Sequence, residues 1–293
     1  MKNNNNIMYT PSVTFDDYFR GEQSKYPQLK RQDVQKLRDA LDKEKQLPAI
    51  SDKKLVAFLH SCYFDVELAR LTAIQCYKSY FEVSKVFCEL DPSAEDMLKN
   101  YDCTSFGELT YDVCSKDDRY VYWQFKDTDP EKFNYMAIFK IVIFWMEYTL
   151  LTKGTFDGLT IVINTSGLNW RHIIKLPVGI ASKLLTFLQQ GLPIRLKSVQ
   201  VLNAGHAARM LLKLVTPFVG KDLMQKIIFH APGSAEVYNY IPKEILPSEE
   251  AGLGKSHNFY NQELYKNITS CRDWFLEQNR DLKKQMIING ENV

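Results

Sequence analysis

Five residues near the C-terminal third resemble the end of a phosphate-binding loop. Gly252, Gly254 and the pair Lys255-Ser256 give the string GLGKS, whose glycines, lysine and hydroxyl are the groups that hold nucleotide phosphates in a P-loop. That loop needs a further glycine five residues before Gly254, but Glu249 occupies the position. Residues 247–250 contain two carboxylates and do not read as a strand, so an anion would meet negative charge first. We therefore expect no nucleotide phosphate to bind here.

The other residues that could take part in catalysis or metal binding do not form a recognised motif. No G-x-G-x-x-G follows a strand, and no G-x-S-x-G nucleophile motif occurs. A zinc-binding helix requires two histidines spaced i, i+4, and no two of the histidines have this spacing. They are His60, His172, His206, His230 and His257. The cysteines form no C-x-x-C pair of the kind found in zinc ribbons, and we expect them to be reduced thiols. They are Cys62, Cys76, Cys88, Cys103, Cys114 and Cys271. We expect neither a metal nor a cofactor.

Glu147 is the strongest single candidate for acid–base chemistry, because it lies in an apolar stretch where burial would raise its pKa. The alternative is a structural carboxylate tied to a backbone or basic partner. No second catalytic group accompanies it in the sequence. We therefore expect the protein not to be an enzyme.

Charge and hydropathy narrow the remaining classes of partner. The net charge is only +2, and the lysines and arginines are dispersed without a stripe of aromatic residues, so no nucleic acid partner is expected. The N-terminus lacks the apolar region of a secretory signal. The most apolar run, residues 135–151, contains Lys140 and Glu147 and is shorter than the roughly 20 apolar residues of a membrane span. We expect a cytoplasmic protein with at most peripheral membrane contact.

The elements that would position a site fall into four segments. Residues 1–28 are polar and predict a flexible lead-in. Residues 29–95 predict a small helical domain, with a first apolar stripe from Val34 to Leu41, a helix capped by Ser51 or Asp52, and another after Asp65. Residues 96–257 predict a larger α/β domain. The tail, residues 258–293, predicts a helical extension packed on the body.

Strand and helix patterns alternate within residues 96–257. Strands are predicted over 119–126, 159–163, 198–202 and 226–230, and helices over about 130–151, 177–190 and 207–214. This alternation predicts an α/β fold, with a mostly parallel sheet flanked by helices and an N-terminal all-helical subdomain.

The helix that begins near Phe133 is apolar around most of its circumference, which indicates that it is buried or lines a cavity. Periodicity alone leaves both interpretations open, because such residues are often ordinary core. If a cavity exists, an apolar pocket of this kind suits a hydrophobic ligand. The candidate lining residues are Phe133, Phe139, Val142, Ile143, Met146, Ile161, Ile163, Leu184, Phe187, Leu188, Leu192, Leu196, Val199 and Val201.

Five blocks, in order, resemble the CRAL-TRIO (Sec14-like) lipid-binding family, and most closely its animal branch, which contains tocopherol and retinaldehyde carriers. The blocks are residues 158–167, which resemble the central strand and turn, 190–197, 202–204, 217–218 and the closing segment 238–247. The helical region resembles the family's lead domain through Leu55, Phe58-Leu59 and Phe64-Asp65-Val66-Glu67. The resemblance spans roughly residues 30–255.

The chain departs from the family pattern at three places. Asn164 replaces the usual aspartate after the central strand, and Glu250 and Ala251 replace the usual tyrosine and first glycine of the closing motif, leaving Gly252. Ala57 and His60 stand where arginines often flank the Phe-Leu pair. The last change removes a cation from the family's basic patch.

The resemblance implies a CRAL-TRIO lipid-binding fold, and a carrier of one hydrophobic ligand such as a retinoid, tocopherol or carotenoid. Val142 and Met146 align with positions where tocopherol-binding relatives have serine hydroxyls, which favours a ligand with fewer hydroxyls. The family's mobile lid corresponds to the helix with Met210, Leu211, Leu214 and Val215. Its phosphoinositide-binding cations correspond to Arg195, Lys197 and Lys226. The alternative function is a regulatory module that binds phosphoinositide or protein without an internal ligand.

Overall fold

The computed structural model describes residues 9–10, 12–109 and 118–291. Cys114 lies outside these ranges. The other five cysteines are free thiols, and four of them are buried.

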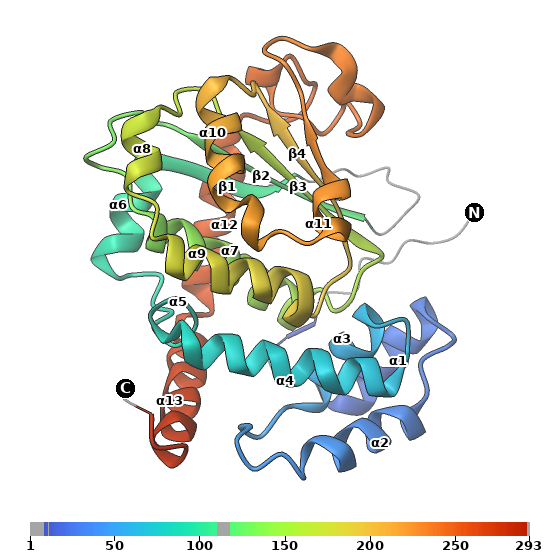
Figure 1. Cartoon of the computed structure of the whole chain (residues 1–293). Helices are drawn as coiled ribbons and strands as arrows, with labels where there is room; N and C mark the ends of the chain where they lie inside the picture. Colours follow the sequence, from blue (N-terminus) through green and yellow to red (C-terminus); the bar gives the residue numbers. More distant parts are fainter. Residues whose placement is uncertain (1–8, 11, 110–117, 292–293) are drawn as a thin grey trace.

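The N-terminal part of the chain forms short helices that pack beside the sheet (Figure 1). Side-chain caps start several of them: Thr14 accepts from the Asp17 amide, Ser51 from that of Lys54, and Asp65 from that of Leu68. The caps at Ser51 and Asp65 begin helices where the sequence predicted them. The helices are α1 (Phe15–Lys25), α2 (Arg31–Leu41), α3 (Asp52–Ser61), α4 (Val66–Glu82), α5 (Ser84–Phe87) and α6 (Glu95–Cys103).

Helix α1 corrects the prediction that residues 1–28 form a flexible lead-in. Tyr18 and Phe19 are buried, and Glu22 is completely buried. Glu22 accepts hydrogen bonds from the backbone and hydroxyl of Thr155 and forms an ion pair of 3.0 Å with Lys25. The contacts between Glu22 and Thr155 join residues more than 120 positions apart, so local sequence gave no signal for them.

A five-stranded sheet in the order β1-β2-β3-β4-β5 forms the centre of the molecule. Strands β2 to β5 are parallel, and β1 pairs antiparallel with β2 at one edge. The predicted α/β fold class is confirmed, while β1 was not predicted. The strands are β1 (Thr104–Leu109), β2 (Asp118–Phe125), β3 (Gly158–Asn164), β4 (Leu196–Leu202) and β5 (Ile227–Phe229).

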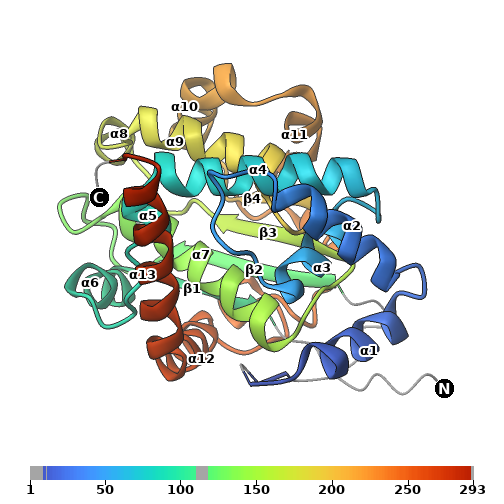
Figure 2. The ribbon, with the colours of Figure 1, turned by 90° about the horizontal axis from the view of Figure 1, so that it is seen from below.

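Because parallel strands follow in sequential order and crossovers are right-handed, all the connecting helices are placed on one face of the sheet. Figure 2 shows α8 to α11 along one side of the sheet. We call this the crossover face; it carries Ile161, Ile163, Val199 and Val201. Its connections are α7 (Tyr135–Thr152), α8 (Trp170–Ile174), α9 (Val178–Thr186) with the π-helix η1 (Phe187–Gly191), α10 (His206–Val215) with the 3-10 turn η2 (Thr216–Phe218), and α11 (Lys221–Lys226).

Residues 237–260 cover the opposite face, which carries Tyr122, Val162 and Leu202 and which we call the C-terminal face, whereas the later residues of the chain pack in the core around α7. The predicted C-terminal helix is two helices that meet at Cys271. Helix α12 lies against β1 on the side away from α8 to α11 (Figure 2). The elements are the 3-10 turns η3 (Ala235–Asn239) and η4 (Ser248–Glu250), then α12 (His257–Ser270) and α13 (Arg272–Ile288).

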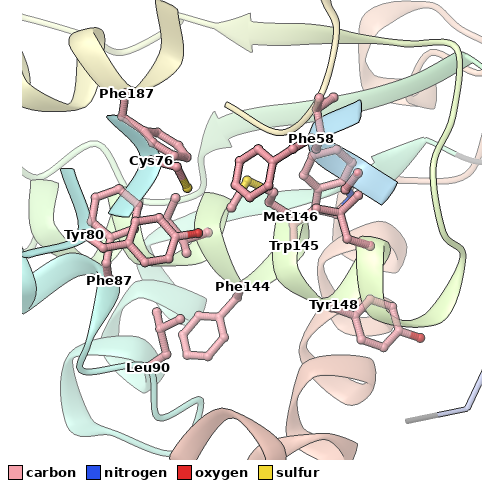
Figure 3. Close-up of a cluster of buried hydrophobic side chains, with 14 of the residues drawn as sticks. Phe58, Cys76, Tyr80, Phe87, Leu90, Phe144, Trp145, Met146, Tyr148 and Phe187 are labelled. Atoms are coloured by element: carbon pink, nitrogen blue, oxygen red, sulfur yellow. The ribbon is translucent and has the colours of Figure 1, made fainter. Parts of the chain in front are cut away.

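The largest core cluster joins the N-terminal helices to the sheet domain through α7 (Figure 3). Phe144 of α7 contacts Phe275 of α13, with ring centroids 4.8 Å apart, and Phe87 of α5 stacks on Tyr80 of α4 at 4.3 Å. Helix α7 is long and apolar enough to cross a membrane, but 67% of its span is buried inside the fold. In this structure it therefore serves as a core helix.

Candidate functional site

Apolar side chains on the crossover face of the sheet are incompletely covered. Ile161 and Ile163 belong to β3, the middle strand of five, yet both are only partly buried. Ile227 and Phe229 on β5 are also partly buried. On β4, which lies between β3 and β5, Val199 and Val201 are 8% and 7% exposed. A central strand covered by a filled core would bury its side chains completely. The crossover face therefore leaves apolar surface available.

Helices α7 and α9 present the same kind of surface. On α7, Phe139 and Val142 are partly buried, and so is Phe133 just before the helix, whereas Ile143 and Met146 are 4% and 1% exposed. Leu184, Leu188, Leu192 and Leu196 are partly buried on the segment from α9 to β4. The predicted pocket residues thus divide into partly covered and fully buried groups.

Phe187 belongs to the fully buried group. Its ring centroid lies 5.0 Å from Phe87 and 5.9 Å from Tyr80, in the contact between η1 and the N-terminal helices. Figure 3 shows it beside Cys76 and Tyr80. Together with Met146, Phe187 is therefore part of the joint between the two regions, while Val142, Ile161 and Leu184 lie at the margin of that core.

Helix α10 covers the crossover face loosely. Only Ala208 is buried on it, whereas the predicted lid residues Leu211 and Val215 are partly buried and Met210 and Leu214 are 40% and 37% exposed. A surface helix normally turns its large apolar residues inward. This helix therefore exposes apolar surface on its outer side as well.

Three further exposed apolar residues surround α10 and were missing from the sequence prediction. Trp170 and Ile174 on α8, which packs against α10, are 61% and 72% exposed, and Phe218 in η2 is 40% exposed. We call Trp170, Ile174, Met210, Leu214 and Phe218 the apolar rim. Solvent-exposed aromatic and branched residues of this size suit contact with a membrane interface. The pairing of Trp170 and Ile174 at i, i+4 was the available signal.

Two buried nitrogen donors lie near Phe133. The Nδ1 atom of His172 accepts from the Asn169 amide at 3.2 Å, which places the ring proton on Nε2, and Nε2 has no hydrogen-bond partner among the described residues. The Nε1 of Trp123 also lacks one. The His172 ring lies 5.2 Å from that of Phe133, and Trp123 lies 6.3 Å from it. Burial lowers the pKa of His172, so its imidazole is a neutral donor.

A cavity of about 840 Å³ lies between the start of α4 and the segment from η1 to α11. Arg195 and Lys226 line it, as does Lys221, which was not predicted. The Arg195 guanidinium lies 4.0 Å from the centre of the exposed Tyr63 ring. Lys197 does not line this cavity, because its ammonium group forms an ion pair with Asp118. The structure thus brings together two of the three predicted cations.

His60 does not restore the cation that the family pattern has near this cavity. The residue is 2% exposed, and its ring lies 4.3 Å from that of Tyr26. Burial and the charges of Arg195 and Lys25 lower the pKa of His60 to about 3. The imidazole is therefore neutral at physiological pH.

Glu147 is a structural carboxylate in this fold. The Lys54 ammonium donates to both of its oxygens, at 2.5 and 2.7 Å, and the Tyr80 hydroxyl donates to one of them at 2.5 Å. These partners come from α3 and α4, so Glu147 joins α7 to the N-terminal helices. The alternative that the sequence left open, a carboxylate tied to a basic partner, is what the structure contains.

The two departures at the end of β3 lie in contact with each other. The Nδ2 of Asn164 donates to Glu250, and the Tyr122 hydroxyl donates to the same carboxylate at 2.8 Å. Ala251 has a φ of +52°, a left-handed conformation that favours the glycine usual at this position. A Cβ on Gly252 would lie 2.0 Å from the Leu246 carbonyl oxygen, so only glycine fits there.

Comparison with known proteins gives two family matches. Residues 115–252 match the CRAL/TRIO domain, and residues 26–97 match the Pinta-like UBA domain. Human alpha-tocopherol transfer protein-like is 25% identical over 240 residues, covering 80% of this chain and 68% of the relative. Human clavesin-2 is 21% identical over 240 residues, covering 80% and 72%. The crystal structure of Sfh5 aligns over 76% of this chain and 79% of its own, with a TM-score of 0.44 and 14% identity.

The matched CRAL/TRIO segment runs from just before β2 to the end of η4, so it contains the parallel strands and every crossover helix. It includes the partly covered crossover face and the Asn164–Glu250 contact. Both curated relatives extend the similarity into the N-terminal helices. The chain therefore matches the CRAL/TRIO domain over residues 115–252 and is similar to two proteins of that kind along most of its length.

Proposed function

We propose that this protein is a cytoplasmic carrier that binds one hydrophobic, lipid-like molecule between the crossover face and helices α7, α9 and α10. The observation that carries the proposal is the partial burial of Ile161 and Ile163 on the central strand. Apolar surface left uncovered inside a fold is what a hydrophobic ligand would cover. The name of the human relative, alpha-tocopherol transfer protein-like, supports a ligand of this class.

Binding strength would come from apolar area. Each buried CH₂ group contributes about 0.8 kcal/mol, so a ligand of about ten to fifteen carbons binds tightly even after ordering costs. The side chains at Val142 and Met146 offer no hydrogen bonds. The two buried donors, Trp123 Nε1 and His172 Nε2, would each bind an acceptor oxygen. We propose a mainly hydrocarbon ligand with an uncharged oxygen at the end nearest Phe133.

Exchange would take place at a membrane surface through α10. The apolar rim on α8, α10 and η2 would insert into the membrane interface, and the loose cover over the sheet would open. Helix α10 buries only Ala208, so few packed contacts oppose this movement.

The test is extraction of the purified full chain with organic solvent, followed by mass spectrometry, together with uptake of retinol, α-tocopherol, β-carotene and phosphatidylcholine. We expect one equivalent of a hydrophobic molecule. Ile163→Trp fills the proposed site and should lower uptake at least about tenfold. Ile288→Trp, at a residue 74% exposed on α13, is the matched control and should leave uptake unchanged. A chain that carries no molecule and takes up none of the four ligands would contradict the carrier function.

The basic cavity supports a second role, binding of a phosphoinositide headgroup during membrane contact. Arg195, Lys221 and Lys226 would bind phosphates through charge-assisted hydrogen bonds. The double variant Arg195→Ala/Lys226→Ala should reduce binding to vesicles that contain phosphoinositide. Lys197→Ala should have a smaller effect, because Lys197 pairs with Asp118, and Lys266→Ala on α12 serves as the charge control.

Vesicle binding without any internal ligand would favour the alternative, a regulatory module with a filled core. In that case Ile163→Trp would lower stability and leave vesicle binding intact. The two sets of variants therefore separate carriage from surface recognition.

A further inference from the structure

Another cavity, of about 380 Å³ and partly open to solvent, lies at the C-terminal end of α7. Its walls come from three regions of the chain: the N-terminal helices α1, α3, α4 and α5 with residues 48–51, then α7 of the sheet domain, and α13 of the C-terminal segment. None of the fourteen residues predicted to bind the lipid lines it. Its size falls within the range of about 300–1,000 Å³ of pockets for small molecules.

The walls are mainly apolar and aromatic. Tyr77, Phe87, Leu150 and Leu282 line the cavity and are between 1% and 8% exposed, and the ring of Trp274 adds a further aromatic wall. Aromatic walls of this kind bind flat apolar molecules by stacking and edge contacts.

Polar side chains also line the cavity, and five of them are charged. Asp52 pairs with Arg38, Asp281 pairs with Lys284, and the Lys53 ammonium group lies over the Tyr18 ring. Lys54 and Glu147 are a closed ion pair, with side chains only 13% exposed on each partner. No hydrogen bond joins the Tyr77 hydroxyl to another described residue, and its oxygen is not among the buried polar atoms without a partner, so it is accessible where Tyr77 lines the cavity. An accessible hydroxyl in a cavity can hydrogen-bond solvent or an oxygen of a ligand.

We infer that this cavity is a second ligand site, for an uncharged, flat, mainly apolar molecule with one hydroxyl or carbonyl oxygen that hydrogen-bonds Tyr77. The ligand is uncharged because Lys54 pairs with Glu147, and Asp52 and Asp281 pair with Arg38 and Lys284, so a further charge would compete with these contacts. It is flat because the walls are aromatic. This inference does not rest on the proposed lipid site.

The test uses Nile red, which is uncharged, flat and carries a carbonyl oxygen, in fluorescence titrations and equilibrium dialysis of the full chain. All variants are made on an Ile163→Trp background, so that the proposed lipid site is blocked. We expect one equivalent of Nile red to remain bound. Tyr77→Phe should weaken that binding about tenfold, the loss expected for one hydrogen bond. Leu282→Trp should abolish it by filling the cavity.

Tyr240→Phe, at a residue 47% exposed on the far side of the sheet from α7, is the matched control and should leave Nile red binding unchanged. If Leu282→Trp does not fold, Tyr77→Phe decides alone, because it keeps the ring. Loss of all Nile red binding in Ile163→Trp would overturn the inference, as would a retained site that responds to neither cavity variant. If the lipid site does not exist, wild type and Ile163→Trp would both bind one equivalent, sensitive to Tyr77→Phe.

Discussion

The two faces of one sheet differ in how completely they are covered. On the C-terminal face, Val162 is fully buried and packs with Ile241, Ile245 and Leu246, which are also fully buried. On the crossover face, the adjacent residues Ile161 and Ile163 are only partly buried. Neighbouring residues of one strand therefore meet a filled core on one side and an incomplete cover on the other. The C-terminal face is a closed core, and the crossover face is the one on which we propose that a ligand binds.

The largest expected effect compares two isoleucines, one for each face. Ile245→Ala should lower the free energy of unfolding by about 3–4 kcal/mol, because it opens a void in a closed core. Ile163→Ala should cost only about 1 kcal/mol in the ligand-free protein, because its surroundings are already incomplete. Urea unfolding of both variants measures the difference. Equal losses would show that the two faces are packed alike.

The next effect concerns the polar end of the C-terminal face. Asn164→Asp restores the residue usual in the family but places a carboxylate against Glu250, and it should lower the free energy of unfolding by about 2–3 kcal/mol. Adding Glu250→Tyr should recover more than half of that loss, because a phenol hydroxyl can donate to the new carboxylate. A double-mutant cycle by chemical denaturation measures this coupling. Additive losses would mean that the two departures are independent.

The apolar rim beside the crossover face should matter for membranes and not for stability. The double variant Trp170→Ala/Ile174→Ala should weaken association with phospholipid vesicles about tenfold, because it removes two large side chains that would insert into the interface. Its free energy of unfolding should change by less than about 0.5 kcal/mol. Ile287→Ala, equally exposed on α13, is the control in the same flotation assay. Equal vesicle binding by the rim variant and the control would exclude the rim as the membrane contact.

The smallest effect is a gain in stability. Ala251→Gly should raise the free energy of unfolding by about 1 kcal/mol, because it relieves a left-handed alanine in the cover of the C-terminal face. Ala231→Gly is the comparison at an exposed position outside the left-handed region, and there the extra freedom of the unfolded chain should produce a small loss. Thermal unfolding of the two variants measures the difference in sign.

Local patterns predicted the elements of the sheet domain well, because strands such as β3 are short apolar runs and the helices between them have caps and stops. β1 was missed because TSFGEL lacks a β-branched apolar core and is held by pairing with β2. α1 was missed because its buried carboxylate, Glu22, has its partner Thr155 in the α7–β3 connection. The secondary structure of such segments depends on contacts with residues far away in the sequence.

The candidate site was predictable only in its chemical type. Sequence identified the apolar residues Val142, Ile161 and Phe187, but periodicity cannot distinguish partial from complete burial. Phe187 is held by Tyr80 and Phe87, which lie more than 90 residues earlier in the chain. Lys197 was grouped with Arg195 by its position in the family motif. Its ion pair with Asp118 could not be predicted from the sequence, because the two residues are far apart along the chain.

Helix α7 shares its core with the N-terminal helices, so we expect that the CRAL/TRIO segment cannot fold as a separate fragment. Cutting the chain ahead of the CRAL/TRIO match would uncover Phe144, Met146 and Phe187, which the first hundred residues now shield. A recombinant fragment of that kind would aggregate, and limited proteolysis of the intact molecule would not release it as a stable product. We therefore expect the folding unit to begin at the first helix, well before the segment that matches the CRAL/TRIO domain.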